Sequence, residues 1–351
     1  MSVRASSSDL LACRQAVRSA LADLDADAGV IVACSGGPDS LALAGVVGQA
    51  AGRDGLRATA VIVDHGLQQD SAQVCDAARR ACEALGLAST VVRVEVGRRG
   101  GPEGAAREAR YAALQDAAIE QGAAAVLLGH TLEDQAETVL LRLARGSGAR
   151  SLAAMAPVAG LWRRPFLQIP RARVRRAAHE VLEPLGLEPW QDPHNNDPAF
   201  ARVRVRAVLE GLRAQLGDGV VAGLARSADL LRDDADALEA LAARAYDAVV
   251  TVNDAGWSAE CDELAALPAA VRTRVLRTMI IAAGCPAEDA GLDHIRVADS
   301  LVTDWHGQGA AHLPSGVRVE RACGRLSVHA GAGIAPSDRT SSHADWRIGG
   351  A

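Results

Sequence analysis

Two glycines, two serines and one aspartate stand together where an apolar run gives way to a helical pattern. The run GVIVA, residues 29–33, is followed by CSGGPDSLAL, residues 34–43. A buried strand that ends in a glycine-rich turn before a helix points several backbone N–H groups and the positive end of the helix at one place. Such a turn binds anions, and phosphate is the anion we expect. The lysine-containing Walker motif is excluded, because all 37 basic residues are arginine.

The residue types in this turn match the parts of a nucleotide phosphate site. Two adjacent glycines allow the backbone to approach a ligand closely, and the hydroxyl groups of Ser35 and Ser40 can bind phosphate oxygens. Asp39 can hold a Mg²⁺ ion that offsets the phosphate charge. The alternative is a plain strand-to-helix turn in which Asp39 caps the helix. We predict a phosphate-binding site that contains Ser35, Gly36, Gly37, Pro38, Asp39 and Ser40.

Histidines follow two later strand-like segments. His65 comes directly after residues 58–64, and His130 comes directly after residues 125–129. Because the carboxyl ends of parallel strands form the ligand-binding edge of such a sheet, we expect both histidines near the nucleotide. For His65 a purely structural role is the alternative.

Two carboxylates and an arginine complete the candidate set. Asp134 and Glu137 are three residues apart, so a helix places both on one face. At the ligand edge of the sheet such a pair suits an ammonium group or a metal ion, whereas elsewhere it would be only a solvated surface. Arg110 shares a helix face with Glu103 and Arg107, and an exposed ion-pair face is the alternative there.

The segments that must position these residues alternate along the chain. Short runs rich in apolar residues at 29–34, 58–64, 89–95 and 125–129 are separated by alanine-rich helical segments. Apolar strands joined by helices indicate a parallel sheet that is covered on both faces. The fold class that we predict is α/β: a doubly wound parallel sheet, followed by a long helix and a small α+β domain.

We expect the chain to be organised in four parts. A helix that begins after an Asp9 cap lies within residues 1–24, and a catalytic domain spans residues 25–215. Residues 219–330 supply a connecting helix and a substrate-binding domain that ends in a hairpin. The composition of residues 331–351 indicates a flexible tail.

Composition narrows the class of protein further. A net charge of −6 argues against a surface coated with nucleic-acid-binding charge, so RNA contacts would need local arginine clusters. No apolar run approaches the roughly 20 residues that span a bilayer. The seven cysteines show no C-x-x-C spacing. We expect a soluble, cytoplasmic protein without a membrane segment, a disulfide framework or a zinc site.

One arginine cluster alternates with valine at residues 202–206. If this segment is extended, Arg202, Arg204 and Arg206 lie on one side, whereas a helix brings only Arg202 and Arg206 together. We expect these guanidinium groups to contact an RNA backbone. The alternative is that the arginine stems pack over an apolar surface.

The motif SGGPDS resembles Ser-Gly-Gly-x-Asp-Ser, the pyrophosphate-binding loop of the ATP pyrophosphatase or PP-loop superfamily. Within that superfamily the chain resembles the tRNA(Ile)-lysidine synthetase family. The matching segments are VDHGL (63–67), PEGAAREARY (102–111), GHTLEDQAETVLLRLARGSG (129–148), RRPFL (163–167) and WQDPHNNDPAFARVRVR (190–206). The resemblance covers most of residues 29–206 and continues more weakly to about residue 330.

This resemblance implies a two-step ligation that uses ATP and Mg²⁺. ATP adenylates oxygen 2 of the wobble cytidine in the CAU anticodon of isoleucine tRNA, and pyrophosphate leaves. The ε-amino group of free L-lysine then attacks carbon 2 and expels AMP. The product, lysidine, makes the anticodon read AUA in place of AUG. The oligomeric state stays open, and a homodimer is compatible with the sequence.

The resemblance also implies roles for the candidate residues. His65 and His130 join the loop in binding ATP, Asp39 holds Mg²⁺, and Asp134 and Glu137 bind lysine. The residues implied in catalysis are Asp39, Arg110, Asp134 and Glu137, and those implied in tRNA binding are Arg202, Arg204 and Arg206.

Two departures from the family pattern and three rival functions remain. Glu133–Asp134 replaces two adjacent aspartates, and Val203 replaces an asparagine. An RNA-thiolating relative would use the same loop but needs reactive cysteines, and Cys34 beside the loop has no evident partner in the sequence. A module that only senses ATP or AMP would not need His130, Asp134 or Glu137. Amidation of a small metabolite is the third rival.

Overall fold

The computed structural model describes residues 6–25, 27–67, 70–97, 101–146, 148–193, 197–254 and 256–331. Contacts divide the chain into two compact units, residues 1–231 and 232–351. Each unit has its own sheet and its own core. The expected tail lies outside the described residues after Gly331.

The first unit is built on a six-stranded sheet. Its strands are β1 (Gly29–Ala33), β2 (Arg57–Asp64), β3 (Ala88–Arg93), β4 (Ala123–Leu127), β5 (Val158–Ala159) and β6 (Trp162–Arg163). Their order is β3-β2-β1-β4-β6-β5, and neighbouring strands from β3 to β6 run parallel. The edge strand β5 runs antiparallel to β6. The predicted doubly wound, parallel-dominated sheet is confirmed.

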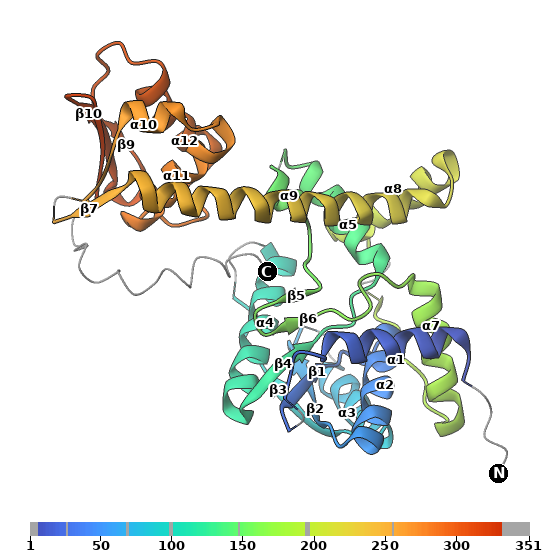
Figure 1. Cartoon of the computed structure of the whole chain (residues 1–351). Coiled ribbons are helices and arrows are strands. Elements are labelled where there is room, and N and C mark those ends of the chain that lie inside the picture. The colour runs from blue at the N-terminus through green and yellow to red at the C-terminus, as the bar shows by residue number, and fades with distance from the viewer. Residues whose placement is uncertain are drawn as a thin grey trace. The chain divides into compact units, whose positions relative to one another are not determined.

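Helices cover both faces of this sheet (Figure 1). On one face lie α1 (Ser8–Ala20), α2 (Pro38–Asp54), α3 (Ser71–Ala84) and α7 (Arg171–Leu182), and on the other lies α4 (Gly101–Gln121). Successive residues of a strand point to opposite faces. In β1, Val30 and Val32 therefore join the first core, whereas Ile31 joins the core under α4. Because both faces of the central strands β1 and β4 are buried, these strands are unbroken apolar runs, whereas most residues of the edge strand β3 are exposed.

A further group of helices extends the first unit. It contains α5 (Leu132–Leu143), α6 (Ala149–Leu152), the short η1 (Glu183–Leu185), α8 (Ala201–Leu216) and the first part of α9 (Gly219–Val249). Leu132 and Ala136 of α5 pack with Leu209 of α8 and with Val221 and Ala225 of α9. This small apolar cluster fixes α5, which follows directly after the carboxyl end of β4 and its short loop.

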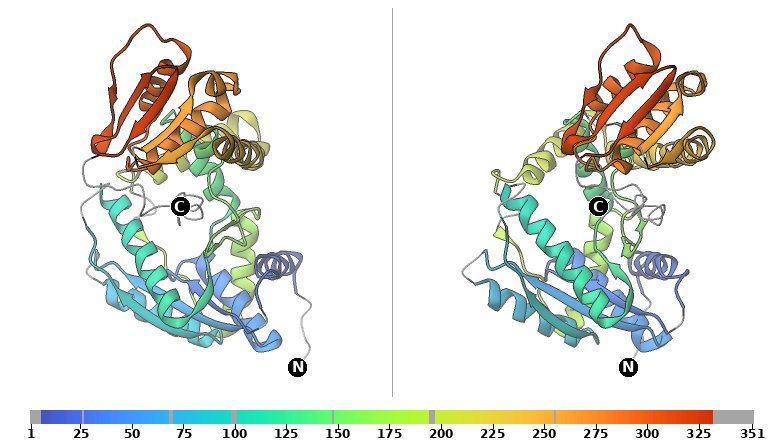
Figure 2. Two further views of the ribbon diagram at one scale, coloured as in Figure 1. Left: turned by 60° about the vertical axis from the view of Figure 1, so that its left-hand side comes forward. Right: turned by 90° about the vertical axis from the view of Figure 1, so that its left-hand side faces the viewer.

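The second unit contains an antiparallel sheet packed against helices (Figure 2). Its elements are β7 (Thr251–Asn253), β8 (Gly256–Glu260), α10 (Cys261–Ala266), α11 (Ala269–Ala282), α12 (Leu292–Thr303), β9 (Ala311–His312), η3 (Pro314–Gly316), β10 (Arg318–Ala322) and β11 (Arg325–His329). The strand order is β7-β8-β11-β10-β9. The predicted hairpin is β10–β11, whose two turn residues, Cys323 and Gly324, both have positive φ, 49° and 78°. The small α+β domain is confirmed.

The start of α1 differs from the prediction. Ser7 is the N-cap, and its hydroxyl accepts a hydrogen bond from the Leu10 N–H at 3.2 Å. Asp9 lies in the first turn, where its carboxylate pairs with Arg173 and Arg176 of α7. The helical pattern alone could not separate a capping carboxylate from one that pairs with a distant helix.

No helix in the described part of the chain is long and apolar enough to cross a membrane.

Candidate active site

The glycine-rich loop connects β1 to α2 at the carboxyl edge of the parallel sheet. Gly36 has φ of +79°, and a Cβ there would lie 3.1 Å from the Ala78 side chain. Both the backbone conformation and the close packing therefore favour glycine at this position. Gly37 is the N-cap of α2, with Pro38 as the first helical residue. A Cβ at Gly37 would meet protein atoms only at 3.6 Å or beyond. Packing within the protein therefore does not require glycine at position 37, and the absence of a side chain leaves space for a ligand.

Hydroxyl groups tie the loop together from within. Ser40 Oγ donates to the Gly37 carbonyl oxygen at 2.9 Å and accepts from the Ser35 N–H at 3.2 Å. The Ser35 hydroxyl, which is exposed, lies 3.3 Å from it. Ser40 thus shapes the loop, whereas Ser35 presents a hydroxyl at its surface.

Close packing brings Asp39 against the end of β4. A Cβ at Gly129 would lie 3.0 Å from the Asp39 carbonyl oxygen, so only glycine lets the start of α2 approach this strand end. The residues after β4, His130 and the start of α5, consequently lie next to the loop. Burial raises the pKa of Asp39 to about 6, against the opposing charge of Arg171.

Asp39 retains an unused acceptor. Its Oδ2 is 3.7 Å from Arg171 Nε and its Oδ1 is 3.9 Å from Arg175 Nε, both beyond hydrogen-bond range. Among the described residues Oδ1 has no hydrogen-bond partner although it is buried. A buried, unpartnered carboxylate oxygen beside a phosphate loop suits Mg²⁺, which binds through one or two carboxylates together with phosphate oxygens.

The carboxylates of α5 have different surroundings. Asp134 Oδ2 accepts from the Thr131 N–H at 2.7 Å and from the Thr131 hydroxyl at 2.8 Å, which closes the first turn of α5. Asp134 Oδ1 accepts from Arg171 Nη2 at 2.8 Å. The same Nη2 donates to Glu137 Oε1 at 3.2 Å, and so does Arg206 Nε at 3.2 Å.

Glu137 is among the most buried charged residues of the molecule. Its exposed fraction is 1%, and its Oε2 has no hydrogen-bond partner in the described part of the chain. For Asp134, burial opposes ionisation, but Arg171, His130 and the two Thr131 hydrogen bonds together lower its pKa. Asp134 is therefore ionised at neutral pH, and the carboxylate oxygen without a hydrogen bond belongs to Glu137.

Unpartnered polar atoms mark the rest of the site. Of the eight buried side-chain atoms without a hydrogen-bond partner among the described residues, five belong to candidate residues: Asp39 Oδ1, His65 Nδ1, Arg110 Nε, His130 Nδ1 and Glu137 Oε2. Leaving such a group unpaired costs about 1–3 kcal/mol, so a ligand is the expected partner. The other three are Arg163, Arg164 and Arg274 Nε.

Positive charge gathers around the two histidines. Burial lowers the pKa of Arg110 and holds that of His130 well below its usual value, and Arg110 adds to the effect on both histidines. Arg107 and Arg110 lie over the ring of Tyr111 at 4.7 and 5.6 Å from its centroid. An imidazole kept neutral can accept or donate a hydrogen bond to a nucleotide without adding charge.

The arginine segment is helical, so the helical alternative applies. Arg202 and Arg206 share a face of α8, and Arg206 reaches Glu137. Arg204 points elsewhere and donates to the Pro198 and Ala199 carbonyl oxygens at 2.7 Å each. The structure thus separates three residues that the sequence treated as one set.

One site residue was not singled out from the sequence. Arg171 belongs to the arginine-rich residues 163–176, which the sequence predicts only as further positive charge for an RNA, but its guanidinium lies among Asp39, Asp134 and Glu137. These carboxylates raise its pKa against the effect of burial. The side chain of Glu103 lies outside what the structure describes.

Cys34 has a neighbour that the sequence did not reveal. The nearby Cys82 thiol of α3 lowers the pKa of the Cys34 thiol, and Cys34 together with burial raises that of Cys82. Both side chains are buried.

In the described residues no group of three or more His, Cys, Asp and Glu side chains is arranged to hold a metal ion.

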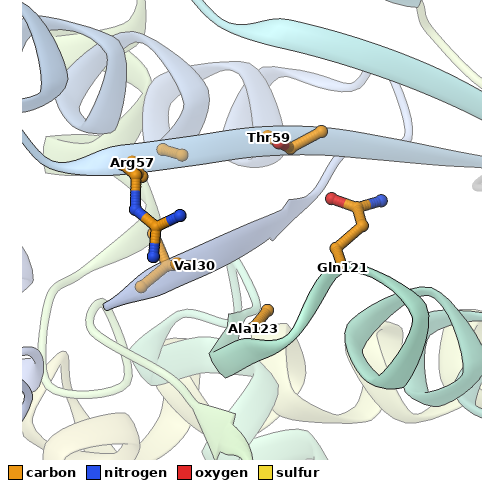
Figure 3. Close-up of a pocket in the computed structure, with 7 residues that line it drawn as sticks. Val30, Arg57, Thr59, Gln121 and Ala123 are labelled. Atoms are coloured by element: carbon orange, nitrogen blue, oxygen red, sulfur yellow. The ribbon is translucent and has the colours of Figure 1, made fainter. Parts of the chain in front are cut away.

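A separate cavity of about 300 Å³ lies at the opposite edge of the sheet (Figure 3). It is lined by the first residues of three parallel strands, Gly29, Arg57 and Ala123. Its single charged side chain, Arg57, already donates to the Asp27 carbonyl oxygen at 2.7 Å. None of the candidate residues lines this cavity, so it is not the predicted site.

The site at the carboxyl edge of a doubly wound sheet, built around this loop, defines a class of ATP-using proteins. The family model described as "PP-loop domain" matches residues 11–212, more than half of the chain, and the chain therefore uses ATP as members of this class do. A model described as "TilS substrate binding domain" matches residues 260–327.

Similar proteins identify the family within that class. A tRNA(Ile)-lysidine synthase from Thermobifida fusca is 53% identical over 319 residues, which cover 90% of this chain and 96% of the relative. One from Mycobacterium tuberculosis is 46% identical over 294 residues, 83% of this chain and 86% of the relative. The chain belongs to the tRNA(Ile)-lysidine synthase family.

A more distant solved structure shares the fold. The U34-tRNA thiolase NcsA from Methanococcus maripaludis, solved with its [4Fe-4S] cluster, matches with a TM-score of 0.53 and 21% identity. The match covers 64% of this chain and 80% of that one. At this identity the likeness is one of fold alone.

Proposed function

We propose that the protein joins L-lysine to carbon 2 of the wobble cytidine in the CAU anticodon of isoleucine tRNA, forming lysidine at the expense of ATP. The observation that carries this proposal is the set of unpartnered polar atoms on Asp39, His65, Arg110, His130 and Glu137 around the glycine-rich loop. They offer acceptors for cations on one side and donors for a nucleotide on the other.

In the first step the loop binds the phosphates of ATP. The backbone N–H groups at the start of α2 and the Ser35 hydroxyl face the phosphate oxygens. Asp39 would hold Mg²⁺, which when bound offsets the negative charge on the phosphates. Oxygen 2 of cytidine attacks the α-phosphorus, the bond to the β-phosphate oxygen breaks, and pyrophosphate leaves.

The base must leave the anticodon stack to reach the loop. Arg110 would stabilise the negative charge that develops during adenylation, because its guanidinium is buried and has an unpartnered Nε. His65 and His130 stay neutral and would hydrogen-bond the nucleotide. Arg202 and Arg206 would contact the RNA, and Arg204 would act by closing the loop before α8.

In the second step Asp134 and Glu137 would supply the negative charge of the site that binds lysine as a cation. Its ε-ammonium group gives a proton to water, the resulting amine attacks carbon 2, the bond from carbon 2 to the adenylated oxygen breaks, and AMP leaves with the electron pair. No covalent bond to the enzyme forms. The second unit, which matches a substrate-binding domain, would bind part of the tRNA outside the anticodon.

Incubation of the purified protein with ATP, Mg²⁺, radiolabelled lysine and isoleucine tRNA carrying CAU tests the proposal. We expect label in the RNA and one AMP for each lysine joined. A tRNA with the wobble cytidine replaced should accept no label. Absence of label from the CAU substrate would contradict the proposal.

The thiolation alternative is tested in the same incubation by replacing lysine with a sulfur donor and assaying the protein for iron. The proposal requires that no sulfur enters the RNA. An ATP sensor would release no pyrophosphate in the presence of tRNA and lysine. We further propose a cytoplasmic location, where tRNA, ATP and lysine meet, and sedimentation would decide between a monomer and a homodimer.

A further inference from the structure

Arg171, the first residue of α7, is held at both ends by α5. Its backbone N–H donates to Glu133 Oε2 at 2.7 Å. Its guanidinium Nη2 bridges Asp134 Oδ1, at 2.8 Å, and Glu137 Oε1, at 3.2 Å. The side chain is 14% exposed, so these contacts are poorly screened by water.

The carboxylate oxygens around this guanidinium accept unequal numbers of hydrogen bonds. Both oxygens of Asp134 are used, Oδ2 by Thr131 and Oδ1 by Arg171. Glu137 Oε1 is used twice, by Arg171 and Arg206, whereas Oε2 is buried without a partner in the described structure. Glu137 Oε2 is therefore the one oxygen of this pair of carboxylates that accepts no hydrogen bond in the described structure, and it is the acceptor that a new cation would meet first.

A guanidinium is suited to this task in a way that an ammonium is not. Its rigid, planar donors can bridge two carboxylates and keep both orientations, whereas a lysine ammonium is a point charge on a flexible stem. Two neighbouring carboxylates would otherwise repel and one would tend to take up a proton. The bridge fixes the orientation of Glu137, so that Oε1 is occupied and Oε2 is free.

We propose that Arg171 is a positioning residue for the lysine step, which rests on the function proposed above. Arg171, anchored on Asp134, holds Glu137 through Oε1 so that Oε2 receives an ammonium group of the substrate lysine. Glu137 is then the carboxylate that contacts lysine, and Asp134 acts through Arg171. Arg171 Nε, at 3.7 Å from Asp39, makes no hydrogen bond to the ATP side of the site.

The test compares Arg171→Ala and Arg171→Lys with the matched control Arg173→Ala. Arg173 lies two residues further along α7 and pairs with Asp9 at 2.5 Å, away from the carboxylates of α5. We measure the apparent KM for lysine in the complete reaction, adenylation of tRNA without lysine, and the melting temperature. Losing one charge-assisted contact to Glu137 should raise the lysine KM by roughly tenfold or more in Arg171→Ala.

Adenylation without lysine should fall by a clearly smaller factor than the lysine KM rises in the same variant, because Arg171 reaches Asp39 only at 3.7 Å, whereas a merely structural loss would lower both steps equally. Arg171→Lys, which keeps the charge but not the bridge, should give an intermediate KM. Arg173→Ala should leave both steps unchanged. A folded Arg171→Ala or Arg171→Lys protein with the wild-type lysine KM would overturn the inference, as would an equal loss in adenylation.

A double-mutant cycle tests whether Arg171 acts through Glu137. Arg171→Ala combined with Glu137→Gln should raise the lysine KM no further than Glu137→Gln alone, because the residue that Arg171 orients has lost its charge. Additive effects would overturn the inference. The wild-type protein separates the two proposals: if it joins no lysine to the tRNA, the proposed function fails, and if it is active while Arg171→Ala binds lysine normally, only the positioning role fails.

Discussion

Asp39 combines properties that a purely structural aspartate would not have. A capping aspartate accepts hydrogen bonds from the first turn of its helix, but the N-cap of α2 is Gly37 and no side-chain cap hydrogen bond is present there. Asp39 instead has a buried oxygen without a partner in the described structure. Burial of a charged, unpaired oxygen is unfavourable for folding, so ligand binding explains its presence better than stability does.

Asp39→Asn should therefore separate activity from stability. The amide keeps the shape but removes the charge that would hold Mg²⁺, and pyrophosphate release should fall by at least about a hundredfold, the usual size of a lost transition-state contact. The melting temperature should stay equal to that of wild type or rise, because a buried charge has been removed. Release of pyrophosphate from ATP and tRNA, with a thermal melt beside it, measures both. Unchanged turnover would contradict the role given to Asp39.

Glu137→Gln should affect lysine more than ATP. Removing one charge-assisted contact should cost roughly 1.5–3 kcal/mol, or about 10- to 150-fold in apparent lysine affinity. Lysine titration of the complete reaction, beside adenylation without lysine, measures the two steps separately. If adenylation or the melting temperature falls while the lysine requirement stays normal, Glu137 binds a metal ion or holds a structural network instead.

Asp134→Asn is the matched comparison on the same helix. Asp134 accepts the Thr131 hydrogen bonds that close the first turn of α5, so its loss should lower stability by about 1 kcal/mol, the usual cost of a lost cap. The two variants should therefore differ: Asp134→Asn should lower both the stability and, because Arg171 loses its anchor, the lysine affinity, whereas Glu137→Gln should lower the lysine affinity alone.

The sequence identified the two carboxylates of the candidate site but did not predict which residues they contact. Asp134 and Glu137 were identifiable because helical spacing is a local property of the chain. Their partner Arg171 lies 37 and 34 residues away, and the pairing depends on how α7 packs beside α5. No periodicity or motif encodes such a contact. The Cys34–Cys82 contact escaped prediction for the same reason.

At the level of elements, β5, β6 and α7 were not predicted, whereas β1 to β4 and the helices between them were predictable because their segments carry apolar runs and helical patterns. The start of α1 and the path of residues 202–206 were not. The local sequence is equally compatible with Asp9 as a helix cap or as an ion-pair partner, and with residues 202–206 as an extended segment or a helix. Tertiary contacts select between these alternatives: Asp9 pairs with α7, and α8 buries Leu209 against α5.

The pair formed by Asp9 with Arg173 and Arg176 should make the docking of α1 depend on pH. These contacts lower the pKa of Asp9 below 3.8, so their contribution is fully present above about pH 4 and is lost as the pH falls through the lower folded value. Both arginines are partly exposed, which limits the contribution to about 1 kcal/mol. Asp9→Asn should therefore lower the melting temperature at pH 7.

The difference between Asp9→Asn and wild type should shrink as the pH is lowered below 4. Asp293→Asn, at a side chain that is 96% exposed, is the control and should change little at either pH. A constant difference between wild type and Asp9→Asn from pH 7 to pH 3 would show that the ion pair is not what stabilises α1.

In the whole molecule, the boundary between the two units lies inside the helix α9. We predicted a domain that begins at residue 219, but the first part of α9 packs with the first unit, which extends to Leu231. A helix that belongs to two units gives no change in composition or periodicity at the boundary. We therefore propose that the catalytic part ends within α9 rather than before it.

Two truncations test this boundary and the role of the second unit together. A chain of residues 1–218 loses Val221 and Ala225 and uncovers Leu132, Ala136 and Leu209, whereas a chain of residues 1–231 keeps the whole cluster. Losing the burial of such side chains costs roughly 2–4 kcal/mol, so the shorter chain should melt at a clearly lower temperature. ATP binding should persist in the longer chain, because the loop and its neighbours all precede residue 231.

The affinity of the longer truncated chain for tRNA should nevertheless fall. The second unit matches a substrate-binding domain, and its loss removes the contacts that it would make outside the anticodon. Filter binding of isoleucine tRNA at fixed salt, compared with the full chain, measures the effect. Equal tRNA affinity would show that the second unit does not contact the RNA, and equal melting temperatures of the two truncations would show that the catalytic part ends before α9.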